Sequence, residues 1–227
     1  LLGNGNSIGL NIQYAIQKKP NGIAESFLIA EQFIANDNVA LILGDNIFYG
    51  IENEPTIDFS NFKTGARVFA YQVPDPSRYG VIEFNNKNIV SIEEKPRKPK
   101  SKLAVTGLYY YDNKVINIAK NIKPSKRNEL EITDVNNSYI NMKNLEFTKL
   151  KNNVVWLDAG TPTSLLQASQ FVQTIQERQQ TNICCPEEAA FKKGFISLNQ
   201  LENIVGSYPN NGYGNYLKNI VIEYKNN

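Results

Sequence analysis

The most restrictive feature of this chain is a fully apolar segment, "VALILG" (39–44), that runs directly into Asp45 and Asn46. A continuous apolar run of this length is typical of a strand covered on both faces in a parallel sheet. The segment before it, 23–35, carries apolar residues at helical spacing, and 10–17 alternates apolar and polar residues as a strand does. Together the three segments predict a right-handed βαβ unit and therefore an α/β fold.

Further strand and helix patterns follow along the chain. A turn is expected at 85–88, where Asn-rich residues separate two strand patterns and would close a hairpin. Strands are predicted at 66–73, 79–85, 89–95, 104–112, 145–150 and 154–160, and helices at 114–122, 129–140 and from Thr161-Pro162 onward.

The end of the chain has a different pattern from the rest. Residues 181–227 contain short helical stretches that are broken by Gly194 and Pro209. We therefore predict a main domain over residues 1–180 and a helical appendage over 181–227 that serves packing and oligomerisation.

Composition excludes several classes of protein. The 24 basic and 22 acidic residues give a net charge of +2, so nothing favours a nucleic-acid or lipid partner. The sequence has no histidine, which excludes Ser-His and Cys-His catalysis and histidine-bound zinc for this chain. No apolar run is long enough to span a membrane and the start is not signal-like, so a cytoplasmic protein is expected. The adjacent Cys184 and Cys185 are expected to be reduced thiols.

Two apolar runs end in an aspartate. Asp45 follows the run at 39–44, and "VVWLDAGTP" leads to Asp158 just before a helix start. Ligands in α/β folds bind beyond the carboxyl ends of the strands, so both carboxylates could serve one site. The alternatives are that Asp45 belongs to a simple turn and that Asp158 caps the helix, although Thr161 could itself be that cap. Two strand-end aspartates can share a Mg²⁺ ion, as suits phosphoryl or nucleotidyl transfer.

Two segments in the middle of the chain offer further ligand contacts. In "SIEEKP", Glu94 could accept hydrogen bonds from sugar hydroxyls and Lys95 could meet a phosphate, although a solvated strand end is the commoner explanation. In "DPSRYGV", Gly80 could let its backbone approach a ligand beside the ring of Tyr79, or the segment is only a turn.

Seven motifs follow one another along the chain: "LILGDNIFYG", "RYGVIEF", "IEEKP", "AVTGLYYYD", "ELEITD", "WLDAGT" and "CCPEEAAFKKGF". They occur in the same order in glucose-1-phosphate thymidylyltransferases, and the likeness covers essentially the whole chain. The sequence resembles this family, whose members make dTDP-glucose and pyrophosphate from dTTP and glucose-1-phosphate for dTDP-rhamnose synthesis. The resemblance implies a Rossmann-like three-layer nucleotidyltransferase fold, with a mostly parallel sheet, an added hairpin region and a C-terminal helical tail. It also implies a Mg²⁺-dependent, cytoplasmic homotetramer.

The resemblance further implies the residues of the site. Asp45 and Asp158 would bind Mg²⁺, and Lys95 and Arg127 would complete the catalytic set by contacting the sugar phosphate. The implied substrate-binding residues are Gln17, Gly22, Asn46, Tyr79, Gly80, Glu94 and Val105. Gln17 would read the thymine edge, which uracil shares, so the choice between dTTP and UTP stays open. In this family the sugar phosphate attacks the α-phosphorus in line, without a covalent enzyme intermediate.

The sequence departs from the family in one respect, because it has no GxGTRL loop followed by a lysine. In the family that loop grips the triphosphate, and residue 1 here falls in the region after it. We therefore expect the chain alone to be poorly active and to depend on the absent segment for stability.

Two other functions stay open at this point. One is a truncated, inactive sugar-nucleotide-binding or assembly partner. The other is a metal-dependent glycosyltransferase, which should carry a DxD acidic pair where this chain has Asp45-Asn46. Pyrophosphate release from dTTP and glucose-1-phosphate separates the three possibilities.

Overall fold

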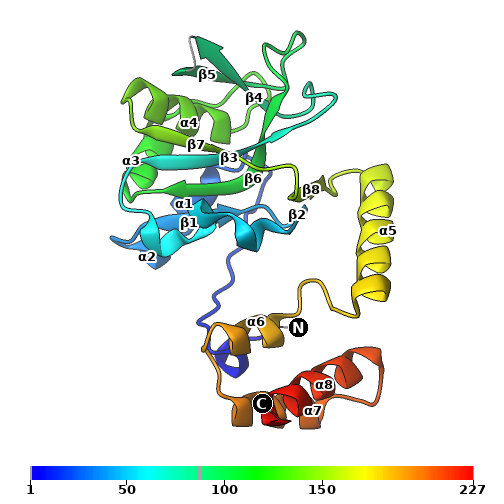
Figure 1. Cartoon of the computed structure of the whole chain (residues 1–227). Helices are drawn as coiled ribbons and strands as arrows, with labels where there is room; N and C mark the ends of the chain where they lie inside the picture. The colour runs from blue at the N-terminus through cyan, green and yellow to red at the C-terminus, as the bar shows by residue number, and fades with distance from the viewer. Residues whose placement is uncertain (1, 86–87, 227) are drawn as a thin grey trace. The chain divides into compact units, whose positions relative to one another are not determined.

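The computed structural model describes residues 2–85 and 88–226 (Figure 1). The chain divides into two compact units, a sheet unit of Ala15–Leu165 and a helical unit of Leu1–Tyr14 with Leu166–Asn227. The domain boundary predicted at residue 180 stays a prediction.

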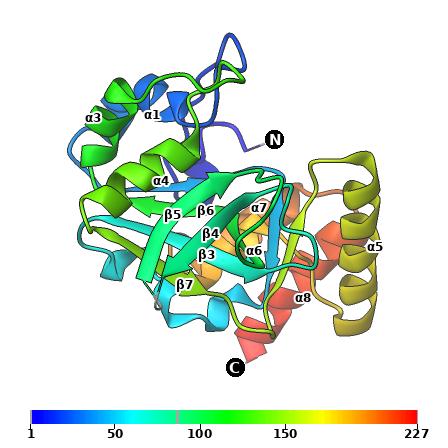
Figure 2. The same ribbon diagram turned by 90° about the horizontal axis from the view of Figure 1, so that it is seen from above.

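The sheet unit is built on a six-stranded sheet (Figure 2). A two-stranded sheet accompanies it. The strands are β1 Val39–Ile42, β2 Asn46–Tyr49, β3 Ala66–Gln72, β4 Gly80–Asn85, β5 Asn88–Glu94, β6 Leu103–Tyr111, β7 Leu145–Lys149 and β8 Val155–Asp158. In the larger sheet the spatial order is β5–β4–β6–β3–β7, and β1 also pairs with β6. The smaller sheet pairs β2 with β8.

The longest strand, β6, positions the other parts of the sheet unit. One of its edges pairs with β3, and the other edge is shared by β4 at Ala104 and by β1 along residues 108–111. Gly107 lies in the gap between β4 and β1, where its carbonyl accepts a hydrogen bond from the N–H of Leu43 at 2.9 Å. The chain segment that follows β1 is therefore anchored beside this gap.

Most pairings in the sheet are antiparallel, which corrects the prediction of a mostly parallel sheet. Among the described strands only β3 and β7 run parallel. β1 pairs antiparallel with β6, its residues alternate between half-buried and exposed, and Ile42 is 63 % exposed. The apolar run at 39–44 does mark a strand, but the direction and number of its neighbours depend on residues far away in the sequence.

The predicted βαβ unit is wrong in its first element, and its helix is interrupted. Residues 10–17 form no strand, because an alternating pattern gives a strand only where a neighbour supplies hydrogen bonds. The helical pattern at 23–35 is divided at Ala30 into α1 (Glu25–Ile29) and α2 (Glu31–Ile34). The α/β class itself is confirmed, since helices flank a mixed sheet.

The remaining predicted elements are confirmed, with ends that differ by a few residues. The β4–β5 hairpin pairs Asn85 with Asn88, and the turn residues 86 and 87 lie outside the described residues. The helices of this part of the chain are α3 Lys114–Asn121, α4 Ile132–Asn141 and α5 Pro162–Gln179. Short 3-10 helices follow β2 at η2 Ile51–Asn53, η3 Pro55–Ile57 and η4 Phe59–Asn61.

Alternation along β3 and β6 divides the core of the sheet unit between the two faces of the sheet. One face is covered by α1, α3 and α4, and its cluster includes Phe27, Val68, Tyr111, Val115, Val135 and Tyr139. The cluster on the other face consists of Phe62, Phe69, Leu108, Tyr110, Leu150 and Val154, with Ile57 and Phe59 from the 3-10 helices packed against it.

The helical unit has its own core. Its helices are η1 Asn6–Ile8, α6 Pro186–Lys192, α7 Leu198–Ser207 and α8 Gly212–Asn226, with most of α5. Ser197 and Gln200 form a capping box at the start of α7. Leu201 and Leu217 are fully buried between α7 and α8, so the predicted helical tail is confirmed.

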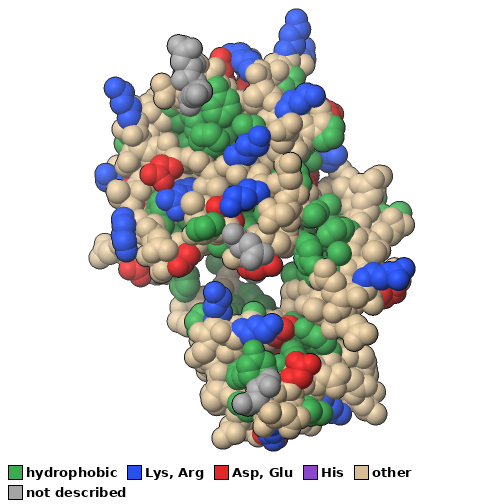
Figure 3. Space-filling model, viewed as in Figure 1, with side chains coloured by type: hydrophobic (Ala, Val, Ile, Leu, Met, Phe, Trp, Pro, Cys, Tyr) green, Lys and Arg blue, Asp and Glu red, His purple; other side chains and the backbone are tan. Residues whose placement is uncertain are grey.

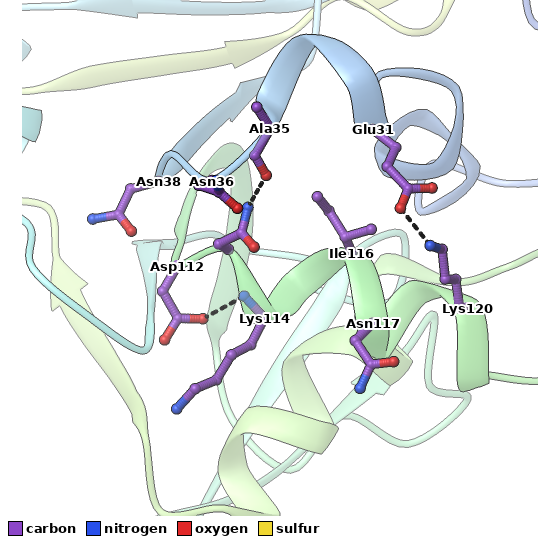
Figure 4. Close-up of a pocket in the computed structure, with 10 residues that line it drawn as sticks. Glu31, Ala35, Asn36, Asn38, Asp112, Lys114, Ile116, Asn117 and Lys120 are labelled. Carbon is purple, nitrogen blue, oxygen red and sulfur yellow. Dashed lines mark hydrogen bonds and ion pairs between the residues drawn. The ribbon is translucent and has the colours of Figure 1, made fainter.

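A buried carboxylate at the end of β6 joins several segments of the sheet unit. Asp112 accepts hydrogen bonds from the hydroxyls of Tyr139 (2.7 Å) and Thr64 (3.0 Å) and from the N–H of Gly65 (2.8 Å). It also accepts from the N–H of Lys114 at 3.2 Å (Figure 4). Burial by itself would raise the pKa of Asp112, but these donors outweigh it and hold the pKa below its usual value.

We expect Asp112→Asn to lower the free energy of unfolding by about 2 kcal/mol at pH 7, because an amide turns a donor toward groups that need an acceptor. The folded-state pKa of Asp112 is depressed, so its stabilisation is present above the unfolded pKa of about 3.9 and is lost as the pH falls through the folded value. The difference between variant and wild type should therefore shrink below about pH 4 in urea unfolding followed by circular dichroism. Asp37→Asn, at an exposed position, is the control, and equal stability of Asp112→Asn and wild type at pH 7 would contradict the prediction.

Candidate active site

The two strand-end aspartates meet beside the gap in the edge of β6. Asp45 lies between β1 and β2, and Asp158 is the last residue of β8. The β2–β8 ladder places Asn46 opposite Asp158, and the N–H of Ala159 donates to the Asp45 carbonyl at 2.8 Å. Backbone pairing therefore holds the two aspartates next to each other.

Gly160 shows how closely the two carboxylates approach. A Cβ atom placed on Gly160 would lie 3.0 Å from Oδ1 of Asp158 and 3.2 Å from Oδ2 of Asp45. Both oxygens therefore border the same small volume, which a side chain at position 160 would occupy.

The helix cap predicted as an alternative role for Asp158 belongs to another residue. The Thr161 hydroxyl accepts from the Ser164 N–H at 3.2 Å, three residues on, which is the usual N-cap bond of a helix such as α5. Oδ1 of Asp158 accepts instead from the N–H of Gly160 at 3.1 Å. Asp158 is thus available to a ligand without loss of the cap.

A pocket of about 520 Å³ opens onto the carboxylate pair, and eight of the eleven predicted site residues line it. They are Asp45, Asn46, Tyr79, Gly80, Glu94, Lys95, Val105 and Asp158. The hairpin β4–β5 and its approach supply the residues from 79 to 95, and β6 supplies Val105. Segments far apart in the sequence thus contribute to one pocket.

The carboxylate of Glu94 is held in a defined orientation within this pocket. Its Oε2 accepts from the Thr133 hydroxyl at 2.6 Å. A Cβ on Gly80 would lie 3.5 Å from the same oxygen, so the missing side chain leaves Glu94 open to a ligand. Lys95 follows with φ of +45° in the left-handed region, and its ammonium lies 3.9 Å from Glu94 Oε1.

Three predicted residues lie outside the lining of the pocket. The Gln17 amide donates to the Gly22 carbonyl at 3.0 Å and to Glu25 at 2.6 Å. Gly22 has φ of +104° and packs against the backbone of Leu130.

Arg127 is the third residue, and carboxylates surround its guanidinium. It donates to Glu131 at 2.8 Å and lies 3.2 Å from Glu129 and 3.8 Å from Glu94. Arg127 does not line the pocket itself, but it lies next to Glu94, which does.

The pocket also contains residues that the sequence reasoning missed. The guanidinium of Arg78 lies 3.9 Å from Oδ2 of Asp158, and the ring centroids of Tyr79 and Trp156 are 5.1 Å apart. Alternation along β8 could have indicated Trp156, because it lies two residues before Asp158 and shares its face of the strand. Burial and the charge of Asp158 raise the pKa of Tyr79, so its phenol stays neutral at ordinary pH.

The donor set of the site fits a magnesium ion. Within residues 2–85 and 88–226, no group of three or more Asp, Glu, His or Cys side chains is arranged to hold a metal ion, so a cation at this site would need further ligands besides the aspartate pair. Mg²⁺ in nucleotide sites is commonly held by one or two carboxylates together with substrate phosphates and water. Two carboxylate oxygens bordering the space beside Gly160 match that requirement.

A second pocket, of about 580 Å³, lies beside α2 and α3 (Figure 4). Some of its polar groups bind one another: Lys120 pairs with Glu31, and the Asn113 amide donates to the Ala35 carbonyl at 2.6 Å. Asp112 in its wall is occupied by the four donors described above. These contacts make the second pocket a part of the scaffold.

Comparison with known proteins agrees with the geometry of the first pocket. A profile of the nucleotidyl transferase family matches residues 1–175. The chain belongs to this family. Glucose-1-phosphate thymidylyltransferases from Neisseria meningitidis and Mycolicibacterium smegmatis are 50 % and 48 % identical to it, over 96 % of this chain and 76 % of each relative. The chain is thus an enzyme of the group that its motifs predicted. Enzymes of this group transfer a nucleotidyl group to a sugar phosphate.

Solved structures show the same fold. A glucose-1-phosphate thymidylyltransferase from Bacillus anthracis, solved with sucrose, superposes with a TM-score of 0.70 at 41 % identity, over 82 % of this chain and 73 % of that one. A UDP-glucose pyrophosphorylase complexed with UDP-glucose superposes with a TM-score of 0.62 at 26 % identity, over 71 % of this chain and 66 % of that one. The nucleotidyltransferase fold predicted from the motifs is confirmed.

The surface shows basic and acidic side chains interspersed over the visible face (Figure 3), in keeping with the net charge of +2. Among the helices that the structure describes, none is both long and apolar enough to cross a membrane.

We expect Gly107→Ala to destabilise the sheet unit, because its Cβ would lie 2.5 Å from Cγ of Asn46. Overpacking of this kind costs about 1–3 kcal/mol, so the thermal unfolding midpoint should fall by several degrees. Gly44→Ala is the matched control, since nothing lies within 4 Å of its Cβ position. Equal unfolding midpoints for the two variants would contradict the prediction, because they would show that the Asn46 side chain can move away from position 107 without loss of stability.

Proposed function

We propose that this enzyme forms dTDP-glucose and pyrophosphate from dTTP and glucose-1-phosphate with the help of Mg²⁺. The observation that carries the proposal is the convergence of Asp45 and Asp158 beside Gly160, inside a pocket that also contains Glu94 and Lys95. A pocket that is lined by a carboxylate pair and also by Glu94 and Lys95 suits a reaction between a triphosphate and a sugar phosphate.

In this proposal the β4–β5 hairpin binds the sugar. Glu94, oriented by Thr133, accepts hydrogen bonds from sugar hydroxyls. Gly80 would leave room for the sugar ring beside Tyr79, and Val105, which also lines the pocket, would contact the sugar through its backbone. Lys95 projects its ammonium near Glu94, where it meets the phosphate of the sugar as a point charge.

Asp45 and Asp158 would hold the magnesium ion, which supplies charge neutralisation on the α-phosphate of the nucleotide. A phosphate oxygen of glucose-1-phosphate attacks the α-phosphorus of dTTP, forming a new P–O bond. The bond from the α-phosphorus to the bridging oxygen breaks, and pyrophosphate leaves with that electron pair. The residues of the chain contribute by fixing both reactants in line, so positioning and electrostatics supply the catalysis.

The remaining assignments rest on the resemblance and complete the proposal. Gln17 and Gly22, which are hydrogen-bonded to each other, would contact the thymine base, and Asn46 would contact substrate with its second amide hydrogen. Arg127 would bind the sugar phosphate from behind Glu94. The proposed setting is the cytoplasm, with a homotetramer supplying dTDP-glucose for dTDP-rhamnose and polysaccharide synthesis.

We expect Asp158→Asn to lower kcat for pyrophosphate release at least about 100-fold relative to the unmodified protein, because it removes one of two charges that hold the cation. A coupled assay with dTTP, glucose-1-phosphate and Mg²⁺ measures the rate. Asp37→Asn, remote from the pocket, should keep the wild-type rate. No pyrophosphate from any of the three proteins would favour a sugar-nucleotide-binding role, and turnover of a nucleotide-sugar donor would favour a glycosyltransferase.

We expect Glu94→Gln to raise KM for glucose-1-phosphate about 10-fold, since an amide keeps the shape but loses a charge-assisted hydrogen bond. The KM for dTTP should stay unchanged, because Glu94 lies on the sugar side of the pocket. Glu83→Gln, on the same hairpin but bonded to Ser91 and Lys100, is the control. Equal increases in both KM values would place Glu94 outside the sugar site.

A further inference from the structure

We propose that Asn46 is a positioning residue that selects which oxygen of Asp45 faces the cation, and thereby sets the affinity of the site for divalent metal. The inference rests on the proposed use of the carboxylate pair. It gives Asn46 a role toward Asp45 in addition to any contact with substrate.

The orientation of the Asn46 amide is fixed by its partners. Oδ1 accepts from the indole N–H of Trp156 at 2.7 Å and from the backbone N–H of Gly107 at 2.8 Å. Both partners can only donate, so the oxygen must occupy this position and the amide cannot be flipped. Nδ2 consequently points the other way, toward Asp45.

The two oxygens of the Asp45 carboxylate have different neighbours because of the Asn46 Nδ2 group. Nδ2 donates to Oδ1 of Asp45 at 2.8 Å. The other oxygen, Oδ2, is the one that lies beside Gly160, where Oδ1 of Asp158 also lies. The hydrogen bond from Asn46 therefore holds the Asp45 carboxylate in the rotamer that presents Oδ2 to the shared space.

The space for Asn46 is formed by the fold itself. Its side chain lies against Gly107, in the gap between β4 and β1 on the edge of β6. Any Cβ at position 107 would occupy the place of the Asn46 amide. The amide thus connects β6, β8 and the β1–β2 turn, and such rigid support keeps a site within the narrow geometry that metal binding needs.

The test measures binding of Mn²⁺ alone, by the electron paramagnetic resonance signal of the free ion. We expect Asn46→Ala and Asn46→Ser to bind Mn²⁺ about 10-fold more weakly than wild type, as is usual when support behind a metal ligand is lost. Asn46→Ser keeps a polar atom for the donors behind it and guards against misfolding, and thermal unfolding identifies the folded variants.

One further variant separates positioning from general stability. Asn38→Ala deletes an amide that makes two hydrogen bonds elsewhere in the sheet unit, to the carbonyls of Phe62 and Lys63, and should bind Mn²⁺ as wild type does.

A spectroscopic readout is available because Trp156 is the only tryptophan of the chain. Saturating Mg²⁺ should change its emission in wild type, where Trp156 and Asp45 share the Asn46 amide, and change it less in Asn46→Ser. Folded Asn46 variants with wild-type Mn²⁺ affinity would overturn the inference while leaving the proposed function intact. Wild type that binds no Mn²⁺ in the absence of substrate would also overturn the inference, whereas the proposed function is decided by pyrophosphate release in the presence of nucleotide.

Discussion

The structure of the site depends on bringing two like charges together and keeping them there. Two carboxylates that border one space repel each other, and free side chains would rotate apart. Here the β2–β8 ladder fixes the backbone on both sides, and local donors hold the side chains: Asn46 on Asp45, and the Gly160 N–H on Asp158. Arg78, 3.9 Å from Asp158, adds a positive charge. Backbone geometry and hydrogen-bond donors thus offset the repulsion between the two carboxylates, in keeping with the cation that we propose for this site.

The arrangement of strands around β6 explains why a pocket lies next to this pair. β3 covers one edge of β6 along its length, whereas β4 and β1 share the other edge and leave Gly107 between them. A continuous partner strand would have closed this gap with ladder hydrogen bonds. The gap admits Asn46 instead, and the hairpin of β4 and β5 forms the far wall with Tyr79, Gly80 and Glu94. The residues that we propose for the sugar and for the metal therefore come from strands that separate at one position of β6.

The sequence indicated the parts of this site that depend on local pattern. Strand-end aspartates, the hairpin and the Thr161 cap each leave a signature within a few residues, and the structure has all three. The pairing direction of β1 and the loss of a strand at 10–17 depend on distant neighbours, so the pattern could not give them. The same holds for the Asn46 amide, whose partners Gly107 and Trp156 lie 61 and 110 residues away in the chain. Arg78 could not be recognised as a pocket residue, because its segment "DPSRYGV" has the composition of an ordinary turn.

The chemistry of the pocket is consistent with a reaction that needs no side-chain base. Among the described residues that line it, the titratable ones are carboxylates, Lys95, Arg78 and tyrosines. The pKa of Tyr79 is raised by burial and by Asp158, and that of Tyr109 by burial and by Glu94 and Asp45, so both phenols stay protonated. A phosphate monoester, however, has a second pKa of about 6 and is already an anion at neutral pH. The nucleophile thus arrives without a proton to remove, and the enzyme's task is to align it and to neutralise charge, which explains how a chain without histidine can carry out this transfer.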